Sequence, residues 1–447
     1  MNILQEFDTI AAISTPLGTG GVGVIRISGE KSFEIASKIT NKTDFPAGKI
    51  CHAWIVDKEK KIDDVIILPF KSPNSYTGED VIEIQCHGGV NVVKNILEIV
   101  LKNGARIAQK GEFTKRAFLN KKMDLSQAEA VDDLIHAKTS DFAIQSVKNL
   151  SGVLAEKIRE IRSQIFEVTS RIVAGIDFPE DVAEPEYSYL IENFEKQLSQ
   201  INKILSYAKT SDVLRQGIKV AIVGRPNVGK SSLFNALLNL NRAIVTNIAG
   251  TTRDVIKENL DLGVAVTLID TAGIRDGENI DKVEEIGIEY SKQSVLEADL
   301  ILFMYDASAG FTEDDSAIYE IIKNKPHVII ANKVDLTPSL TPRQKEELQL
   351  STYSKQGMEE LKNLIKDKVC DFSPEDTEFI TNERQQGCLI RCRESLERAL
   401  EAAKRQELQD MIFIDLKSAL LSLDELTGEV VTDEILDNIF NHFCIGK

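Results

Sequence analysis

The sequence predicts a multidomain α/β fold, in which a parallel-sheet domain interrupts a helical region and a mixed α+β region comes first. Three observations predict it. The chain has 447 residues, enough for about two to four domains. The pattern of apolar residues changes along the chain from that of short strands and turns to that of helices. The helical pattern is then interrupted and resumes near the end. Between the helical stretches, the apolar run Lys219–Val223 leads into a glycine-rich turn and another helical pattern, as in an α/β unit.

Four segments follow from these changes. Residues 1–118 mix strands with turns, and residues 119–215 are mostly helical, with a break at the proline of Ile176–Pro179. Residues 216–371 are expected to form the inserted α/β domain, and residues 372–447 are helical again. Packing the two helical segments together would couple the inserted domain to the rest of the chain. The strands predicted in the first segment are Val22–Ser28, Asp64–Pro69 and Asp80–Gln85.

Composition limits the class of protein. The formal net charge of −17 argues against a chain that coats nucleic acid over its whole surface. A basic stretch from Arg106 to Lys122 suits a solvated face as well as a phosphate- or carboxylate-binding role. The six cysteines form no C-x-x-C pair, which favours free thiols in a reducing cytoplasm. The sequence has no long apolar run and no signal-peptide pattern at its start, so no membrane role is expected.

Residues 224–231 read Gly-Arg-Pro-Asn-Val-Gly-Lys-Ser, the phosphate-binding loop pattern G-x-x-x-x-G-K-[ST]. The run before it suits a buried strand, and Ser232–Leu240 after it has helical spacing. A strand, a glycine-rich turn and a helix N-terminus point backbone N–H groups and a positive dipole end at a phosphate. We therefore expect Lys230 to reach the β- and γ-phosphates of a nucleotide and Ser231 to hold Mg²⁺.

A second motif predicts that the base is guanine. His327–Ala331 reads as a buried strand that leads into Asn-Lys-Val-Asp. The carboxylate of Asp335 can accept two hydrogen bonds from the N1–H and exocyclic amine of guanine, whereas adenine offers the wrong pattern. Asn332 would brace this loop, and the stem of Lys333 would cover the face of the base. Ser351–Thr352 is expected to supply the last guanine contact.

Two segments between these motifs have the features of nucleotide-sensing switches. The predicted strand Val266–Ile269 delivers Asp270, which we place in the outer coordination sphere of Mg²⁺. Gly273 can approach the γ-phosphate because it has no side chain. The threonine-rich loop Gly250–Asp254 offers hydroxyl groups, and Thr252 is the expected second Mg²⁺ ligand. Such loops order on the γ-phosphate and relax after hydrolysis.

The hydrolytic machinery differs from that of Ras-like enzymes. Ile274 occupies the position where those enzymes use a glutamine to orient the attacking water, and no arginine finger is evident. An arginine finger is worth roughly 10³–10⁵ in rate, so another group must replace it. Glu284 is the expected polar group. Asn227 could help to hold a monovalent cation beside the phosphates, or it could only shape the turn.

Beyond these motifs, the chain resembles the MnmE family (also called TrmE), the tRNA-modification GTPases of bacteria and organelles, from end to end. The segments that carry the resemblance are Asp8–Ala12, Gly20–Gly29, Tyr76–Glu83, His87–Gly89, Gly111–Asn120, Asp124–Ala130, Gly250–Asp254, Val283–Glu284 and Phe443–Lys447. The resemblance implies an α+β folate-binding and dimerisation domain at the N-terminus, a discontinuous helical domain and an inserted Ras-like P-loop GTPase domain. These correspond to residues 1–118, to 119–215 with 372–447, and to 216–371.

The resemblance also implies the site residues. Glu284, Lys230 and Asp270 match catalytic positions, Ser231 and Thr252 match the Mg²⁺ ligands, and the folate-binding positions are Arg26, Glu83 and Lys122. The K⁺ ligands match Asn227, Thr246, Ile248 and Thr251. The GTP-binding set comprises Asn227, Val228, Gly229, Lys230, Ser231, Ser232, Thr246, Asn247, Ile248, Ala249, Gly250, Thr251, Thr252, Asp270, Thr271, Ala272, Gly273, Asn332, Lys333, Asp335, Ser351 and Thr352.

The implied activity is K⁺-activated GTP hydrolysis coupled to tRNA modification. Members of the family form homodimers, whose GTPase domains meet in a K⁺-dependent way. With an FAD-dependent MnmG-type partner that uses NADH, in a heterotetramer, they add an aminomethyl or carboxymethylaminomethyl group to the wobble uridine of certain tRNAs. A folate such as 5-formyl-tetrahydrofolate supplies the one-carbon unit. Two interpretations of Cys444 stay open, a role near the folate and a buried tail thiol.

Two other functions are compatible with parts of the sequence. A ribosome-assembly GTPase would be a binding switch without covalent chemistry, and it would carry an RNA-binding module after the GTPase domain. The C-terminal segment instead reads as amphipathic helices, which disfavours it. A stand-alone folate enzyme, in which GTP is only regulatory, would transfer a one-carbon unit without a flavoprotein.

Overall fold

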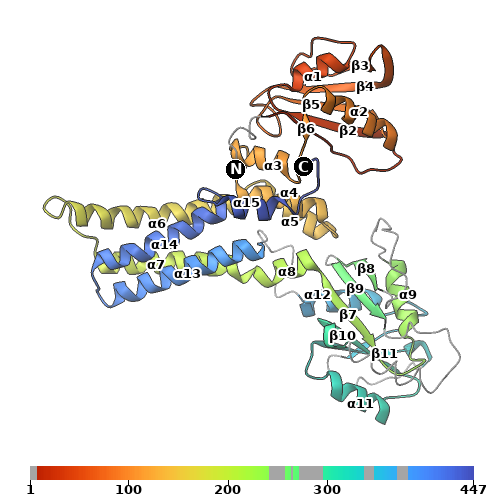
Figure 1. Cartoon of the computed structure of the whole chain (residues 1–447). Helices are drawn as coiled ribbons and strands as arrows, with labels where there is room; N and C mark the ends of the chain where they lie inside the picture. The colour runs from red at the N-terminus through yellow and green to blue at the C-terminus, as the bar shows by residue number, and fades with distance from the viewer. Residues whose placement is uncertain (1–7, 241–256, 263–264, 271–294, 337–346, 370–380) are drawn as a thin grey trace. The chain divides into compact units, whose positions relative to one another are not determined.

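The computed structural model describes residues 8–240, 257–262, 265–270, 295–336, 347–369 and 381–447. The chain divides into two compact units. The first contains residues 1–132 and 421–447, and the second contains residues 133–420. Each unit combines helices with a six-stranded sheet, which confirms the predicted multidomain α/β fold (Figure 1).

The sheet of the first unit has the strand order β3-β4-β5-β2-β1-β6. Its neighbouring strands are antiparallel, except that β1 and β6 are parallel. The prediction of strands at 22–28, 64–69 and 80–85 is confirmed by β2, by the second half of β4 and by most of β5. The strands are β1 (Ile10–Ile13), β2 (Val22–Ser28), β3 (Cys51–Asp57), β4 (Lys60–Phe70), β5 (Val81–His87) and β6 (Arg106–Ile107).

Helices of the first unit bury one apolar side each. Helix α2 places Val93, Ile96 and Val100 at intervals of three and four residues, and these side chains belong to the same buried cluster as Ile25 and Ile84 of the sheet. A second cluster joins the start of α4 to α15. The helices are α1 (Ser32–Ile39), α2 (Val90–Lys102), α3 (Glu112–Leu119), α4 (Leu125–His136, which ends in the second unit) and α15 (Asp433–Phe440).

The second unit contains long helices from both predicted helical segments. Helix α7 packs against α6 and against α13, although α13 lies far along the chain (Figure 1). Helix α6 ends at Asp177, two residues before Pro179, as the predicted break requires. The helices are α5 (Ser140–Leu150), α6 (Val153–Asp177), α7 (Tyr187–Ser206), α8 (Ala208–Gln216), α13 (Glu383–Lys404) and α14 (Gln409–Thr427, which ends in the first unit).

The sheet of the second unit has the order β12-β11-β10-β7-β9-β8, and all its neighbouring strands are parallel except β8 and β9. The predicted buried strands are confirmed as β7, β9 and β11, whose residues are apolar along almost their whole length. The strands are β7 (Ile218–Val223), β8 (Lys257–Asp261), β9 (Ala265–Asp270), β10 (Leu300–Asp306), β11 (His327–Asn332) and β12 (Glu347–Gln349). The helices beside them are α9 (Lys230–Leu240), α11 (Glu313–Ile322), the short 3₁₀ helix η2 (Val334–Leu336) and α12 (Met358–Val369).

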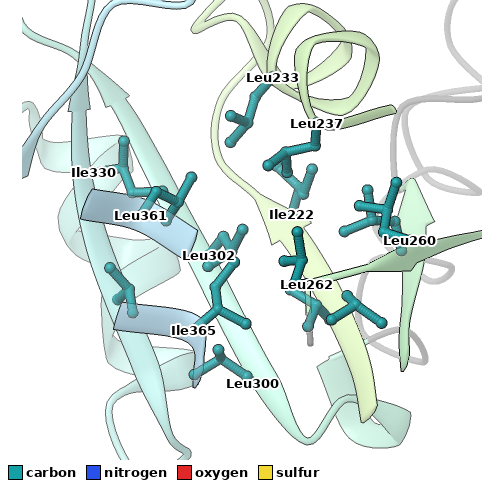
Figure 2. Close-up of a cluster of buried hydrophobic side chains, with 14 of the residues drawn as sticks. Ile222, Leu233, Leu237, Leu260, Leu262, Leu300, Leu302, Ile330, Leu361 and Ile365 are labelled. Atoms are coloured by element: carbon teal, nitrogen blue, oxygen red, sulfur yellow. The ribbon is translucent and has the colours of Figure 1, made fainter. Parts of the chain in front are cut away.

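A core of buried aliphatic side chains holds this sheet against α9 and α12. Figure 2 shows Ile222 and Leu302 of adjacent strands facing Leu237 and Leu361 of the helices. All four side chains are fully buried, and burying each one contributes roughly 1.5–3 kcal/mol. The loops at the carboxyl ends of the parallel strands are thereby fixed on a rigid base.

The chain leaves and re-enters the helical part at one place. The N–H of Thr381, just before α13, donates to Oγ of Ser211 in α8 at 3.1 Å. Nearby, Nε2 of Gln386 donates to Asp212 at 3.2 Å. The whole second sheet lies between Ser211 and Thr381 in the sequence, so these bonds join the two ends of its segment.

Candidate functional site: a nucleotide loop and an arginine–glutamate pair

The phosphate-loop sequence lies between β7 and α9, as predicted. Lys230 is the first residue of α9, and its Nζ donates to the carbonyl oxygens of Gly224 at 2.7 Å and Arg225 at 2.8 Å. The ammonium group of Lys230 therefore lies over the phosphate loop, which directly precedes α9. Ser231 and Ser232 lie exposed in the first turn of α9, where a phosphate and its metal ion would bind.

Backbone conformation shapes the loop around this lysine. Asn227 has φ of 64° and Gly229 has φ of 102°, so both lie in the left-handed region. Alternation of left- and right-handed residues directs successive N–H groups to one side, which makes a concave site for anions. The side chain of Asn227 is exposed, whereas Val228 is buried in the core.

The loop after β11 is tied directly to the phosphate loop. Asn332 is fully buried, and its Nδ2 donates to the carbonyl oxygen of Val228 at 2.8 Å. Its Oδ1 accepts from the N–H of Thr352 at 3.3 Å. One amide side chain thus joins three loops.

Asp335 and Lys333 are each held by a neighbouring side chain. Ser351 donates to Oδ1 of Asp335 at 2.6 Å, and Asp335 is otherwise exposed. Lys333 pairs with Asp306, the last residue of β10, at 2.6 Å. Burial acts to raise the pKa of Asp306, but hydrogen bonds from Lys333 and Ser308 outweigh it and lower that pKa. A carboxylate that is ionised and fixed in place therefore anchors the lysine.

The remaining nucleotide-site predictions lie outside the described residues. Asp270 ends β9, where the strand pairs with Ile222, but its side chain is not described. The predictions outside the described ranges concern Thr246, Asn247, Ile248, Ala249, Gly250, Thr251, Thr252, Thr271, Ala272, Gly273 and Glu284. Within the described ranges, no group of three His, Cys, Asp or Glu side chains gathers to hold a metal.

In the first unit, two of the predicted folate residues face each other across neighbouring strands. Arg26 of β2 is in register with Glu83 of β5, and Arg26 Nε donates to Glu83 Oε1 at 2.8 Å. The guanidinium also lies 5.0 Å from the ring centroid of Tyr76 and 5.5 Å from that of Phe113. Arg26 Nη1 is buried and has no hydrogen-bond partner among the described residues. A buried unpaired donor is costly, so this nitrogen fits a ligand acceptor.

The third predicted folate residue contacts a different group. Lys122 follows α3, and its Nζ donates to the carbonyl oxygen of Pro73 at 2.9 Å. Its stem lies beside Gly78, where an added Cβ would come within 3.3 Å of Lys122 Cγ. Lys122 is thus held against the 73–78 loop, which also carries Tyr76.

The tail at 443–447 is hydrogen-bonded to α3, which carries Phe113 beside Arg26. The N–H of Phe113 donates to the carbonyl oxygen of Lys447 at 3.2 Å. Burial is the main cause that lowers the pKa of Lys447, and the nearby positive charge of Arg26 lowers it further. The proximity of Lys447 to this site cannot be predicted from the sequence, because no periodic pattern links it to Arg26.

Cys444 has an exposed side chain, and its carbonyl oxygen accepts from the N–H of Gly111 at 3.4 Å. The interpretation of Cys444 as a buried tail thiol is therefore wrong. Cys444 helps to fix the tail through its backbone carbonyl group, and its side chain stays accessible to solvent.

Together, the strand–loop–helix unit, the lysine over its loop and the braced Asn-Lys-Val-Asp loop define a P-loop GTPase domain. Comparison with known proteins identifies the family. Residues 9–122 match the family described as GTP-binding protein TrmE N-terminus, and residues 125–444 match the MnmE helical domain. The tRNA modification GTPase MnmE of Thermoanaerobacter pseudethanolicus is 44% identical over 99% of this chain and 100% of its own length. The protein of that name from Staphylococcus aureus strain Newman is 38% identical, over 99% and 100%.

The chain belongs to the MnmE family of tRNA modification GTPases and is a GTP hydrolase. A solved structure of Era from Aquifex aeolicus with GDP and aluminium fluoride is 32% identical over 40% of this chain and 66% of that one, with a TM-score of 0.28. Within the described residues, no helix is long and apolar enough to cross a membrane.

Proposed function

We propose that this chain hydrolyses GTP at residues 224–231 and uses the reaction to drive modification of tRNA in the cytoplasm. The observation that carries the GTP site is the bridge from Asn332 to Val228, because it joins the phosphate loop to the loop that would read guanine. Asp335, oriented by Ser351, would accept from the base. Lys230 would contact the β- and γ-phosphates, while Ser231, Thr252 and Asp270 would serve the Mg²⁺ that accompanies the nucleotide.

Hydrolysis in this proposal depends on K⁺. The cation would supply the charge that an arginine finger supplies elsewhere, with Asn227, Thr246, Ile248 and Thr251 as its ligands. The exposure of Asn227 at a left-handed position supports the proposal, because its side chain is not used to fill the core. Glu284 would orient the attacking water.

The second proposed site binds a folate such as 5-formyl-tetrahydrofolate. Support comes from the buried Nη1 of Arg26, which has no hydrogen-bond partner among the residues that the structure describes and suits an acceptor on the ligand, and from the two aromatic rings close to the guanidinium. Glu83 can accept hydrogen bonds from amine groups such as those of a pterin ring. Lys122 and Cys444 complete the proposed set. The folate, when bound, would supply a one-carbon unit.

The assembly in this proposal is a homodimer that forms a heterotetramer with an MnmG-type flavoprotein. That partner would bring FAD and NADH, and together they would add an aminomethyl or carboxymethylaminomethyl group to C5 of the wobble uridine. The proposed domains are 1–118 for folate binding and dimerisation, 119–215 with 372–447 for the helical domain, and 216–371 for GTP hydrolysis. The family to which the chain belongs supports this division of labour.

The first test is GTP turnover by the purified protein in K⁺ and in Na⁺, over a series of protein concentrations. The expected result is that GTP turnover per protein molecule rises with K⁺ and with protein concentration, because the cation would join two GTPase domains. Equal slow rates in both salts would overturn the K⁺ proposal while leaving GTP binding intact. Calorimetric titration of the protein with 5-formyl-tetrahydrofolate tests the second site independently of GTP.

A further inference from the structure

One ion pair joins the phosphate loop to α11, and the function proposed above assigns it no role. Arg225 is the second residue of the loop, and its Nε donates to Oδ1 of Asp315 at 2.8 Å. The side chain of Asp315 is fully buried, whereas that of Arg225 is 24% exposed. Asp315 lies in the first turn of α11, 90 residues further along the chain.

The other oxygen of Asp315 is used to begin this helix. Oδ2 accepts from the N–H of Thr312 at 3.0 Å and from its Oγ1 at 2.9 Å, and the two residues form a capping box. A carboxylate removed from water is costly unless charge and hydrogen bonds compensate it. Arg225 supplies the compensating charge, and the hydrogen bond to Asp315 is the main cause that raises the pKa of Arg225.

The backbone of Arg225 acts directly on the phosphate-binding lysine. Its carbonyl oxygen and that of Gly224 both accept from Lys230 Nζ. Gly224 itself is pressed against β10, because an added Cβ would lie only 2.2 Å from the carbonyl oxygen of Met304. The start of the loop is therefore fixed by β10 through Gly224 and by α11 through the side chain of Arg225.

We propose that the Arg225–Asp315 ion pair is a positioning element of the nucleotide site. It holds the peptide at 224–225 so that Lys230 faces the bound phosphates before the nucleotide arrives. Through the same carboxylate it links the shape of the loop to the first turn of α11. The proposal rests on residues 224–231 being the phosphate loop. It adds an interaction that the loop pattern does not predict, because Asp315 lies outside the loop.

The test measures the affinity of the full-length chain for a fluorescent GDP analogue, together with kcat and KM for GTP. Arg225→Gln and Asp315→Asn should each raise the Kd about tenfold, since the lysine must then be reoriented on binding. The double variant should lose no more affinity than the single variant that binds more weakly, because both changes break the same interaction. Arg225→Lys, which keeps a positive charge, should recover part of the affinity.

Two controls separate positioning from general stability. Glu313→Gln removes a charge from the same turn of α11 at an exposed position and should leave the Kd within twofold of wild type. Thr312→Val removes the hydroxyl from the cap but keeps the contact with Arg225, so it should lower the Tm without changing the Kd.

A Kd within twofold of wild type for folded Arg225→Gln would overturn the proposal, as would losses that add in the double variant. If Asp315→Asn does not fold, the comparison of Arg225→Gln with Arg225→Lys decides, because Arg225 is partly exposed. Wild-type protein that failed to bind GDP would instead refute the assignment of the phosphate loop itself.

Discussion

The substitution Gly229→Ala tests how the phosphate loop is built. An added Cβ would lie 2.3 Å from Nδ2 of Asn332, inside the range that real Cβ atoms avoid. The residue also has φ of 102°, where an L-amino acid is strained by roughly 1–2 kcal/mol or more. Relief of the clash would break the bond from Asn332 to Val228 and leave buried polar groups unpaired, at a cost of about 1–3 kcal/mol.

Together these two terms raise the free energy of the native loop conformation by about 2–5 kcal/mol. The free protein can relax the loop, but nucleotide binding requires it to return. The lower bound of about 2 kcal/mol corresponds to a loss of roughly 30-fold in affinity. Equilibrium titration with a fluorescent GDP analogue measures this loss, and thermal unfolding reports whether the domain is still folded.

Gly310→Ala is a matched control. Gly310 also has positive φ, 73°, but an added Cβ would meet no atom within 4 Å. Both variants should lose stability through backbone strain, and only Gly229→Ala should lose nucleotide affinity. A folded Gly229→Ala protein that binds GDP within threefold of wild type would refute the argument that this glycine is required by contact with Asn332.

Four further outcomes are expected. Asn227→Ala should abolish K⁺ stimulation of GTP turnover while GDP affinity stays nearly unchanged, and a retained K⁺ response would remove Asn227 from the cation site. Glu284→Ala should lower kcat strongly with little change in KM, because it acts on the water; normal turnover would assign that role to another residue. Arg26→Ala should weaken binding of 5-formyl-tetrahydrofolate at least tenfold, measured by calorimetry, with GTP turnover unchanged as its control. Burial raises the pKa of Cys392 to about 12, which leaves almost no thiolate at pH 8, so iodoacetamide followed by mass spectrometry should label Cys444 well before Cys392.

Local patterns in the sequence were enough to predict the elements that form the nucleotide site. The strands β7, β9 and β11 are largely buried, and their apolar runs, such as Val220–Val223 and Val328–Ala331, stand out from the sequence. The phosphate loop and the Asn-Lys-Val-Asp loop follow two of these strands directly. Each loop has a short, distinctive residue pattern that is typical of nucleotide binding, so each motif can be recognised on its own.

Contacts between distant residues could not be predicted in this way. Asp315 reads as one of several acids at the start of a helix, and only the fold brings it to Arg225. Lys447 likewise comes within the electrostatic influence of Arg26 because the tail is fixed to α3 by backbone hydrogen bonds, which any residue type can make. The left-handed conformation of Asn227 depends on three-dimensional packing as well, and so does the burial of Arg26 Nη1 without a hydrogen-bond partner in the described part of the chain.

The hydrogen bond between Ser211 and Thr381 has a consequence for the order of folding. These residues are 170 positions apart, and closing a flexible chain of that length costs about 4–5 kcal/mol in entropy. If the intervening sheet forms first, its two ends already lie close together and most of that cost is removed. Folding of the sheet would then favour the pairing of α7 with α13, although neither helix belongs to the sheet.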